Sequence, residues 1–432
     1  MRSIWSEPAL LPRFAALKQD LHTDVLVIGG GIAGLLCARK LEEAGVACVL
    51  VEAGRICGGI TQNTTAKITA QHGLIYSRLT REFGPETAEL YLRANREALE
   101  EYRTLARGIP CDFREEDSIV YSLNDPRKIE AELEALAQVG YPAVFLSELP
   151  LPLPAAGAVC FPRQARFHPL KFLAAIVRDL RIFEDTRVLE LKPGEALTNR
   201  GRIRAEKIIV ATHFPFLNKH GSYFLKLYQH RSYVLALEHA AQPPGMYADE
   251  AGAGLSFRNA GELLLLGGGG HRTGKQGGGW QELEAFAARH YPAARAAARW
   301  ATQDCMTLDG IPYVGQYSKR TPNLLVATGF NKWGMTSAMA AAGLLTDLVL
   351  EKPNPYAEIF SPSRTILRRQ LAVNAAESAL HLLKPTTPRC PHMGCALQYN
   401  PQEHSWDCPC HGSRFAEDGR LLNNPATGDK RL

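Results

Sequence analysis

The chain has 432 residues, of which 46% are hydrophobic and 22% are charged, and its formal net charge is +5. This length predicts two or three domains, and the small charge without a clustered basic tract argues against nucleic acid as a partner. The chain lacks both an apolar run of about eighteen residues, which a membrane span requires, and the features of a signal peptide, so we expect a cytoplasmic protein with no membrane span.

Hydrophobic periodicity predicts a βαβ unit near the N-terminus, with strands over residues 24–28 and 47–51 around a helix over 32–44. Residues 77–138 follow a charged, helical pattern with little strand character. A helix is then expected over 170–180, and strands are expected over 187–191, 205–211, 233–238, 262–266 and 323–327. Two helices complete the pattern, over 336–350 and 364–383. The second would be amphipathic, with this apolar side: Ile366, Leu367, Leu371, Ala375, Leu380 and Leu383.

A glycine-rich turn, G-x-G-x-x-G over residues 29–34, joins the first strand to its helix. Gly29 allows a tight turn, Gly31 lets the backbone approach a pyrophosphate, and Gly34 lets the helix pack closely on the strand. The helix N-terminus stabilises phosphate charge, and Glu52 ends the second strand, where a carboxylate can accept hydrogen bonds from ribose hydroxyls. The complete unit predicts a dinucleotide site. No second such motif follows a strand, which argues against a separate nicotinamide domain.

Three further segments resemble the D-amino-acid-oxidase-like flavoproteins, and with the glycine turn they cover most of residues 22–352. Residues 58–61 (G-G-I-T) resemble the stretch of that family that passes near the flavin. Residues 328–336 resemble its C-terminal flavin motif, in which a helix N-terminus points at the isoalloxazine. The strand around Val188 matches the region that reads the adenine. The resemblance implies FAD and these cofactor-binding residues: Gly29, Gly31, Gly34, Glu52, Gly58, Gly59, Thr61, Val188, Gly329, Gly334, Met335 and Thr336.

Simpler interpretations stay open for two of these segments. Gly329 and Gly334 could serve only as turn residues. Residues 64–67 (T-T-A-K) could be a solvated helix start, whereas the functional interpretation places Lys67 or a threonine hydroxyl near flavin N5.

Four of the ten cysteines crowd between residues 390 and 410, in two boxes that also hold two histidines. Residues 390–395 (C-P-H-M-G-C) and 408–413 (C-P-C-H-G-S) resemble the cluster boxes of Rieske proteins. The resemblance implies a 2Fe–2S cluster with thiolates on one iron and imidazoles on the other, and a disulfide between the two extra cysteines. Its predicted ligands are Cys390, Cys408, His392 and His411, and its predicted disulfide is Cys395–Cys410.

Imidazole ligands raise the reduction potential of such a cluster from about −400 mV to roughly −150 to +300 mV. The alternative is a structural zinc site of two cysteines and two histidines, which leaves the two extra cysteines unexplained. Phe415 stands where high-potential Rieske proteins have a tyrosine that donates a hydrogen bond to a ligand sulfur. Since hydrogen bonds to sulfur raise the potential, we expect a value below that of the tyrosine-containing proteins.

The expected fold is α/β, with a Rossmann-like FAD-binding domain, an inserted α+β substrate domain and a small all-β cluster domain. We assign residues 22–90, 150–215 and 300–352 to the FAD-binding domain and residues 91–149 and 216–299 to the substrate domain. Residues 361–384 would form a linker helix and 385–432 the cluster domain. Because some forty-five residues rarely make a self-sufficient core, the cluster domain should lean on the flavoprotein body.

For the whole chain, residues 65–67, 71–73 and 309–312 resemble bacterial FAD-dependent oxidoreductases with a C-terminal Rieske domain. The leading hypothesis is a dehydrogenase or oxidase in which a small substrate, with an amine or amino acid favoured, gives a hydride to flavin N5. Electrons would then leave singly through the cluster to an external acceptor. Candidate catalytic residues are Lys67, Tyr233, His271, Arg272 and Lys332, although the simpler interpretation of His271 and Arg272, after four glycines, is a flexible polar turn.

Two rival hypotheses keep the same cofactors. In one, electrons flow from an external donor through the cluster to the flavin. In the other, the protein is an electron carrier or redox sensor without a small-molecule substrate. A Rieske oxygenase is not expected, because no histidine follows His411 to complete a mononuclear iron site.

Overall fold

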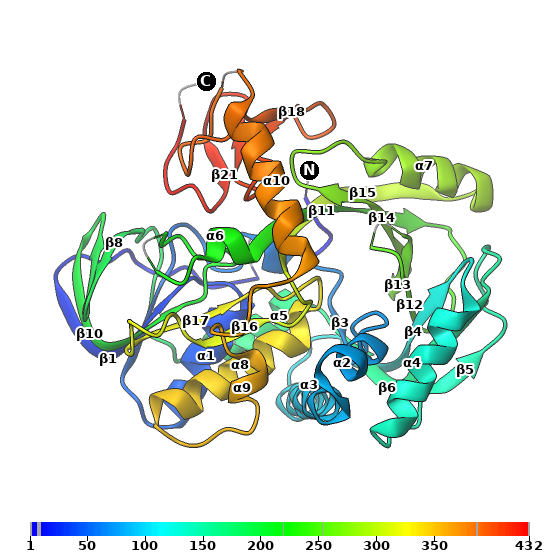
Figure 1. The fold of residues 1–432 in the computed structure, drawn as a ribbon, viewed down its shortest axis with the longest axis horizontal. Helices are drawn as coiled ribbons and strands as arrows, with labels where there is room; N and C mark the ends of the chain where they lie inside the picture. The colour runs from blue at the N-terminus through cyan, green and yellow to red at the C-terminus, as the bar shows by residue number, and fades with distance from the viewer. Residues whose placement is uncertain (1, 7–9, 219, 253, 386–387, 431–432) are drawn as a thin grey trace.

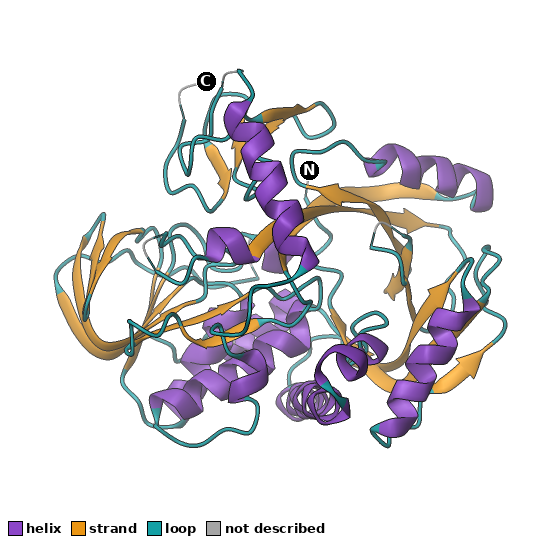
Figure 2. Cartoon of the chain, in the orientation of Figure 1, coloured by secondary structure: helices purple, strands orange, loops and turns teal. Residues whose placement is uncertain are grey.

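The computed structural model describes residues 2–6, 10–218, 220–252, 254–385 and 388–430. Two large mixed sheets lie side by side and a small C-terminal sheet sits over their junction (Figure 1). We call residues 388–430 the C-terminal subdomain and residues 10–362 the body. Figure 2 shows helices packed below the large sheets, whereas the C-terminal subdomain is made of short strands and loops.

The first sheet carries the expected βαβ unit. Val25 and Val27 of its central strand pack on one side with the core that includes the first helix, and Leu26 and Ile28 pack on the other, which explains the uninterrupted apolar run. Both neighbours of this strand are parallel to it. In spatial order the strands are β16 (Tyr313–Gln316), β17 (Leu324–Thr328), β10 (Gly201–Val210), β1 (Leu21–Ile28), β2 (Cys48–Val51) and β7 (Ile182–Phe183), with β8 (Val188–Lys192) and β9 (Glu195–Thr198) extending from β10.

Several helices and one 3-10 turn surround this sheet. α1 packs against α8, and α8 packs against α3, so the N-termini of α1 and α8 are brought to the same region. The bounds are α1 (Ile32–Glu43), η1 (Ile60–Asn63), α3 (Pro85–Leu105), α5 (Pro169–Ile176), α6 (Tyr223–Lys226), α8 (Gly334–Val349) and α9 (Ala357–Phe360).

The second sheet is mostly antiparallel and forms the other half of the body. Its order is β15 (Arg295–Thr307), β11 (Leu227–Glu238), β14 (Leu263–Arg272), β13 (Ser256–Ala260), β12 (Met246–Asp249), β4 (Arg114–Ser122), β6 (Gly157–Arg166) and β3 (Lys67–Ile68), with β5 (Val144–Leu146) beside β6. The helices α2 (Tyr76–Phe83), α4 (Pro126–Gln138) and α7 (Gly279–His290) belong to this half.

Two expectations about the body differ from the structure. Residues 114–122 form a strand inside the region expected to be helical, because their S-I-V-Y-S run pairs with β6 and is buried there. β6, β3 and most of β15 lie in the second sheet, although the predicted boundaries assigned those residues to the FAD-binding domain. The chain crosses between the two sheets more often than the domain boundaries implied.

The C-terminal subdomain has four short antiparallel strands, β18 (Gln398–Asn400), β19 (Ser405–Asp407), β20 (Arg414–Ala416) and β21 (Leu421–Asn423). Its buried core consists of the following residues: Cys390, Cys395, Leu397, Cys408, Cys410, Phe415 and Ala426. More than half of these are cysteines, so little apolar surface holds the subdomain together by itself.

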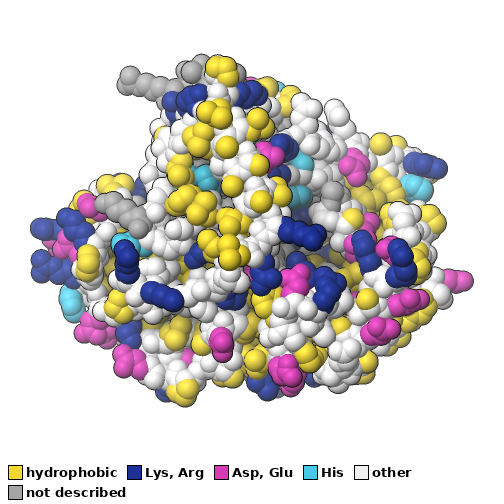
Figure 3. All heavy atoms as spheres, in the orientation of Figure 1, with side chains coloured by type: hydrophobic (Ala, Val, Ile, Leu, Met, Phe, Trp, Pro, Cys, Tyr) yellow, Lys and Arg dark blue, Asp and Glu magenta, His cyan; other side chains and the backbone are white. Residues whose placement is uncertain are grey.

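α10 (Arg369–Leu383) connects the body to the C-terminal subdomain. Its expected apolar side is not the buried side: Leu380 and Leu383 are 60% and 81% exposed, whereas Asn374 and His381 are buried. Asn374 is held by Arg272, whose Nη1 donates to its Oδ1 at 2.9 Å. Apolar side chains therefore run along the outer face of this helix (Figure 3). In the described ranges, no helix is both long and apolar enough to cross a bilayer.

Candidate functional site

A cavity of about 850 Å³ lies where the two large sheets meet. Its lining combines the turn after β1, the N-terminal residues of α1 and α8, the faces of β11 and β15, and residues 421–424 of the C-terminal subdomain. Both helix N-termini bring partial positive charge to the cavity. This volume is within the range of cofactor and ligand pockets.

The glycine turn has the geometry that its motif predicts. Gly29 has φ +113°, and a Cβ there would lie 2.6 Å from the carbonyl oxygen of Ala211 on the adjacent chain segment. A Cβ on Gly34 would lie 1.9 Å from the carbonyl oxygen of Gly29, so only glycine permits this packing of helix on strand. Thr61 adds a contact at the start of α1, where its hydroxyl accepts from the Ile32 N–H at 3.0 Å.

Glu52 follows β2 and lines the same cavity. Its Oε2 accepts from the Gly30 N–H at 2.8 Å and its Oε1 from the Gly54 N–H at 2.9 Å. Burial raises the pKa of this carboxyl, and the two backbone donors oppose that shift. The carboxylate is thus held beside the glycine turn at the position proposed for ribose recognition.

Most of the other predicted cofactor residues also line the cavity: Gly58, Gly59, Thr61, Val188, Gly329, Gly334 and Met335. Thr336 does not line it: this residue is buried, and its hydroxyl donates to the Thr69 carbonyl oxygen at 2.9 Å. The same hydroxyl lies 2.9 Å from Nε2 of the buried His72. A phosphate-binding turn and two helix N-termini around one cavity fit an extended dinucleotide with an anionic middle.

The two cysteine–histidine boxes form matching loops in the C-terminal subdomain. In each loop the carbonyl oxygen of the first cysteine accepts a hydrogen bond from the backbone N–H of the glycine four residues later. The Gly394 N–H donates to Cys390 O and the Gly412 N–H to Cys408 O, both at 2.9 Å. Both glycines have positive φ, 79° and 83°. The Cys390 and Cys408 thiols are hydrogen-bonded to each other, and this lowers the pKa of Cys390 to about 7.

His392 and His411 point their rings at the same region, with centroids 4.9 Å apart. Burial lowers the pKa of His392 to about 4 and that of His411 to about 3, so both rings are neutral at pH 7. The Nδ1 atom of each ring is buried without a hydrogen-bond partner among the described residues. Two neutral imidazoles with free Nδ1 atoms beside two sulfur atoms are the donor set that a Rieske cluster requires.

The Nε2 atoms of these histidines contact the body. Nε2 of His392 lies 2.9 Å from Asn218 Oδ1, and Nε2 of His411 lies 3.1 Å from the Phe224 carbonyl oxygen. Such contacts place the proton on Nε2 and leave Nδ1 as the ligating atom. A disulfide joins Cys395 to Cys410 across the two loops.

Comparisons with known proteins account for both sites. The profile of the FAD-dependent oxidoreductases (DAO) matches residues 24–348. The chain belongs to this family of FAD-dependent oxidoreductases. The profile of the Rieske [2Fe-2S] domain matches residues 361–430. The protein is therefore an FAD-dependent oxidoreductase whose cofactors are FAD and a 2Fe–2S cluster, and the zinc alternative for the two boxes is set aside.

The chain is similar to Rieske iron-sulfur protein YhfW of Bacillus subtilis, with 36% identity over 98% of this chain and 95% of that protein. It also has 32% identity to cytochrome b6-f complex iron-sulfur subunit 3 of a Nostoc species, over 20% of this chain and 53% of that subunit.

Solved structures resemble the FAD-dependent part. Glycine oxidase from Geobacillus kaustophilus has a TM-score of 0.67 at 20% identity, covering 80% of this chain and 99% of that one. L-proline dehydrogenase from P. horikoshii also has a TM-score of 0.67, at 17% identity, covering 81% and 98%. At such identities the likeness establishes the fold, which agrees with the predicted fold class.

The predicted catalytic residues of this oxidoreductase separate into two groups. Lys67 and Lys332 line the FAD cavity: their Nζ atoms donate to the carbonyl oxygens of Tyr247 at 2.8 Å and Gly252 at 2.7 Å. Burial lowers the pKa of both, that of Lys67 to about 7. Tyr233 borders the cavity, but its hydroxyl donates to Glu403 of the C-terminal subdomain at 3.1 Å.

His271 and Arg272 are not among the residues that line the FAD cavity. His271 Nε2 lies 2.9 Å from the Tyr233 hydroxyl, and Arg272 donates to the carbonyl oxygens of Pro409 at 3.1 Å and Cys410 at 3.3 Å. The reason is strand pairing: β14 carries both residues beyond the cavity to the edge that faces the C-terminal subdomain. Their contacts are those of an interface.

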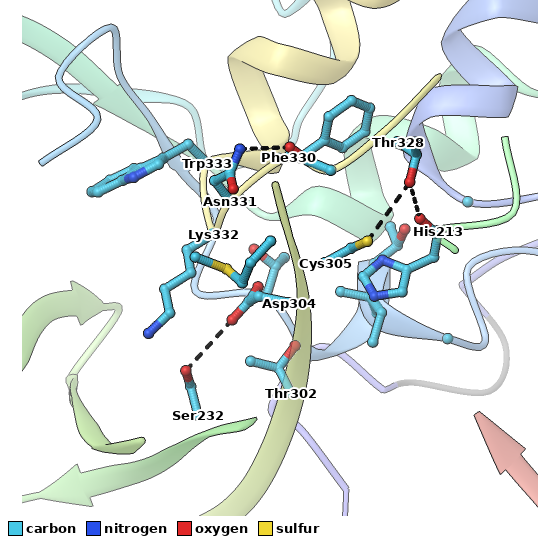
Figure 4. A pocket seen from close by; sticks show the side chains of 18 of the residues that line it. His213, Ser232, Thr302, Asp304, Cys305, Thr328, Phe330, Asn331, Lys332 and Trp333 are labelled. Atoms are coloured by element: carbon cyan, nitrogen blue, oxygen red, sulfur yellow. Dashed lines mark hydrogen bonds between the residues drawn. The ribbon is translucent and has the colours of Figure 1, made fainter. Parts of the chain in front are cut away.

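Sequence reasoning missed a polar group on β11 and β15. Ser232, Thr302 and Asp304 surround the same space as Lys332 (Figure 4). The Ser232 hydroxyl donates to Asp304 Oδ2 at 3.4 Å, and burial raises the pKa of the Asp304 carboxyl. The available signal was the period-two alternation of Thr302, Asp304 and Met306, which marks one face of a strand.

Proposed function

We propose that this oxidoreductase oxidises a small amino acid or amine at the carbon that bears nitrogen and passes the electrons singly to an external acceptor. The observation that carries the substrate class is the opposite pair of charged groups in the FAD cavity, Lys332 and Asp304. Each is half-buried, and each makes its hydrogen bond to a neutral partner, Gly252 and Ser232 respectively, although the two side chains also attract each other. A zwitterion would supply each with a charged hydrogen-bond partner.

Lys332 suits the carboxylate of such a substrate, because an ammonium group in a low-dielectric cavity gains much from an anionic partner. Asp304 suits the substrate nitrogen, since a carboxylate accepts from an amine or ammonium group. A simple amine would use Asp304 and leave Lys332 with its backbone acceptor. The two residues therefore distinguish amino acids from amines.

Lys67 is the residue best suited to take a proton from the substrate nitrogen. An amine must lose its ammonium proton before the adjacent carbon can release a hydride. With a pKa of about 7, the Lys67 amine is partly neutral at physiological pH and can act as a base, which an ordinary lysine does rarely.

When bound, FAD accepts a hydride equivalent and the 2Fe–2S cluster carries single electrons, so the pair can convert a two-electron oxidation into one-electron steps. Two imidazole ligands raise the potential of the cluster, which favours electron flow from flavin to cluster. His411 contacts the body that contains the FAD cavity, which suits electron exchange between the two cofactors in either direction.

The carrier or sensor hypothesis is less well supported. A protein that exchanges electrons only with protein partners has no need for a half-buried lysine and a half-buried aspartate in its flavin cavity. Buried charged groups are expensive and cluster at functional sites.

Anaerobic mixing of the holoprotein with a panel of amino acids and matching amines tests the proposal. We expect flavin bleaching followed by reduction of the cluster. The Lys332→Met variant should raise KM for amino acids about 10–100-fold, the equivalent of a charged hydrogen bond worth about 1.5–3 kcal/mol, and should change KM for amines little. Bleaching only by reduced protein partners would instead support the carrier hypothesis, and reduction of the cluster before the flavin would support the reverse flow.

A further inference from the structure

We propose that Gln229 is the positioning residue that connects the FAD cavity to the cluster, through one line of contacts from His213 to Gln229 to His411. The inference deepens the proposed function and rests on it only in requiring that both cofactors exchange electrons. It assigns a role to a buried strand residue that belongs to neither sequence motif.

Strands β11 and β15 stand between part of the FAD cavity and the cluster loops, while residues 421–424 of the C-terminal subdomain reach the cavity directly. On β11, Tyr228 and Ser232 line the FAD cavity, whereas Gln229 and Arg231 between them bond to the C-terminal subdomain. On β15 the same alternation places Thr302 and Asp304 on the cavity side and Gln303 on the other. Because side chains alternate across a strand, this pair of strands is a wall one layer thick between the sites.

Gln229 lies on the subdomain face of these strands, and its amide contacts both the cluster loop and His213, a residue that lines the cavity. Its Nε2 donates to the His411 carbonyl oxygen at 2.9 Å and to the Asn424 carbonyl oxygen at 3.0 Å. Its Oε1 accepts from His213 Nε2 at 3.1 Å, and His213 lines the FAD cavity. Two hydrogen bonds through one amide thus join a cavity residue to a predicted cluster ligand.

The surroundings hold this amide in place. Gln229 is 1% exposed, and the fully buried Gln303 donates to its Oε1 while also donating to the Gly412 carbonyl oxygen at 2.8 Å. A Cβ on Gly412 would lie 2.6 Å from the Gln229 Cβ, so the cluster loop lies against this side chain with no space for a larger residue. The cluster loop is therefore docked on Gln229 in one position.

His213 and Asn424 both line the cavity and contact the Gln229 amide. Burial lowers the pKa of His213 to about 4, so its ring is neutral and its Nε2–H is a plain donor to Gln229. Asn424 belongs to the C-terminal subdomain, lines the FAD cavity, and donates to the carbonyl oxygens of Thr212 at 2.6 Å and Phe214 at 2.7 Å. The loop around His213 is thereby bonded to the C-terminal subdomain beside Gln229.

The transfer along this line moves one electron and forms or breaks no bond in the protein. With both groups bound, each event would take one electron from the anionic reduced flavin and convert one ferric ion of the cluster to ferrous. Two events would return the flavin to its oxidised form and release its one proton to the cavity. Between them the cluster must pass its electron to the external one-electron acceptor that the proposed function already includes.

The test is the Gln229→Met variant, which keeps the length of the side chain and removes the four hydrogen bonds of its amide, to His213, Gln303, His411 and Asn424. The oxidised holoprotein receives one electron from a photoexcited deazaflavin, and absorbance then follows the redistribution of the electron between flavin and cluster. We expect this rate to fall about tenfold or more, at the low end of what outer-shell changes do at metal sites, with both midpoint potentials and the EPR g-values unchanged. No substrate is involved, so failure of the substrate assignment leaves this measurement intact.

Gln402→Met is the matched control, because Gln402 also bonds across the interface, accepting from the Trp280 N–H at 3.0 Å, but away from the wall. Its rate should equal that of the parent. Equal rates in parent and Gln229→Met, or equal slowing in both variants, would overturn the proposal. If Gln229→Met does not load both cofactors, His213→Leu interrupts the same line from the cavity side and should slow the same rate.

Discussion

The body and the C-terminal subdomain solve the same problem, holding a redox cofactor, in opposite ways. The FAD site is built from a complete sheet with its own extensive core, whereas the subdomain has a core of seven buried residues, four of them cysteines. The subdomain compensates with polar contacts to the body. The comparison teaches that a cofactor site can depend on a neighbouring fold for both its stability and the orientation of its ligands.

Those polar contacts include a buried network of four charged residues. Arg231 of β11 pairs with Glu403, which also pairs with Arg414 at 2.9 Å, and Arg414 pairs with Asp407 at 2.9 Å. All four side chains are at most 10% exposed, and their charges cancel. The two arginines lower the pKa of Glu403 against the opposing effect of burial.

The largest expected effect tests whether the C-terminal subdomain depends on the body while the body does not depend on the subdomain. Gly34→Ala would place a Cβ 1.9 Å from a carbonyl oxygen in the body, and we expect loss of FAD and cluster together. Cys408→Ser should remove the cluster and leave FAD bound. Cys160 is a buried cysteine outside the two boxes, and the control variant Cys160→Ser should retain both cofactors. Absorbance, iron content and EPR report the outcome. A cluster that survives in Gly34→Ala would mean that the subdomain is independent.

The next effect concerns the interface network. Arg231→Met leaves Glu403 buried without one of its two cations, and removal of one member of a buried pair costs about 3–5 kcal/mol. We expect the subdomain to detach, which limited proteolysis near α10 and urea unfolding followed by cluster absorbance would detect. The double variant Arg231→Met/Glu403→Met should recover part of the loss, and a single variant as stable as the parent would contradict the role of the network.

A third prediction separates the chemistry of the body from that of the subdomain. If neutral Lys67 is the base, kcat/KM for an amine substrate rises with pH through about 7, because protonated Lys67 cannot accept a proton. Lys67→Met should lower kcat/KM by about 100-fold or more and abolish this rise of kcat/KM with pH. The cluster potential should not move. If kcat/KM of the variant still rises with pH near 7, another residue is the base.

The smallest effect is confined to the subdomain. Phe415 is fully buried in its core, and Phe415→Tyr introduces a hydroxyl intended to donate to a ligand sulfur. We expect the midpoint potential to rise by roughly 20–60 mV, the one-electron equivalent of a hydrogen bond worth about 0.5–1.5 kcal/mol. An EPR-monitored titration measures it, and an unchanged or lower potential would argue that the hydroxyl bonds elsewhere.

The local motifs were predictable because each is a short run of residues with a fixed physical task. The glycine turn at Gly29 and the two cysteine–histidine boxes form as their spacing indicated. Long-range arrangement was not predictable in the same way. His271 and Arg272 were predicted to be catalytic residues, yet the pairing of β14 with β11 carries them to the interface with the C-terminal subdomain.

α10 shows the same limit. Its apolar periodicity was real, but the choice of which face is buried depends on Arg272, which lies about a hundred residues away and binds Asn374. Gln229 carried no signal at all, because a glutamine inside a strand has many ordinary explanations. Its significance depends on which loops lie on the two sides of that strand.

The hydrogen bonds from Nε2 of His392 and His411 to Asn218 and Phe224 have a consequence for how the protein matures. These acceptors do not exist until the body has folded, so the two histidines cannot be fixed in their ligating tautomer and orientation before then. Biogenesis should therefore be ordered, with the flavin half complete before iron and sulfide are inserted. Cells that lack riboflavin should accumulate chain without iron, whereas cells starved of iron should still accumulate yellow protein.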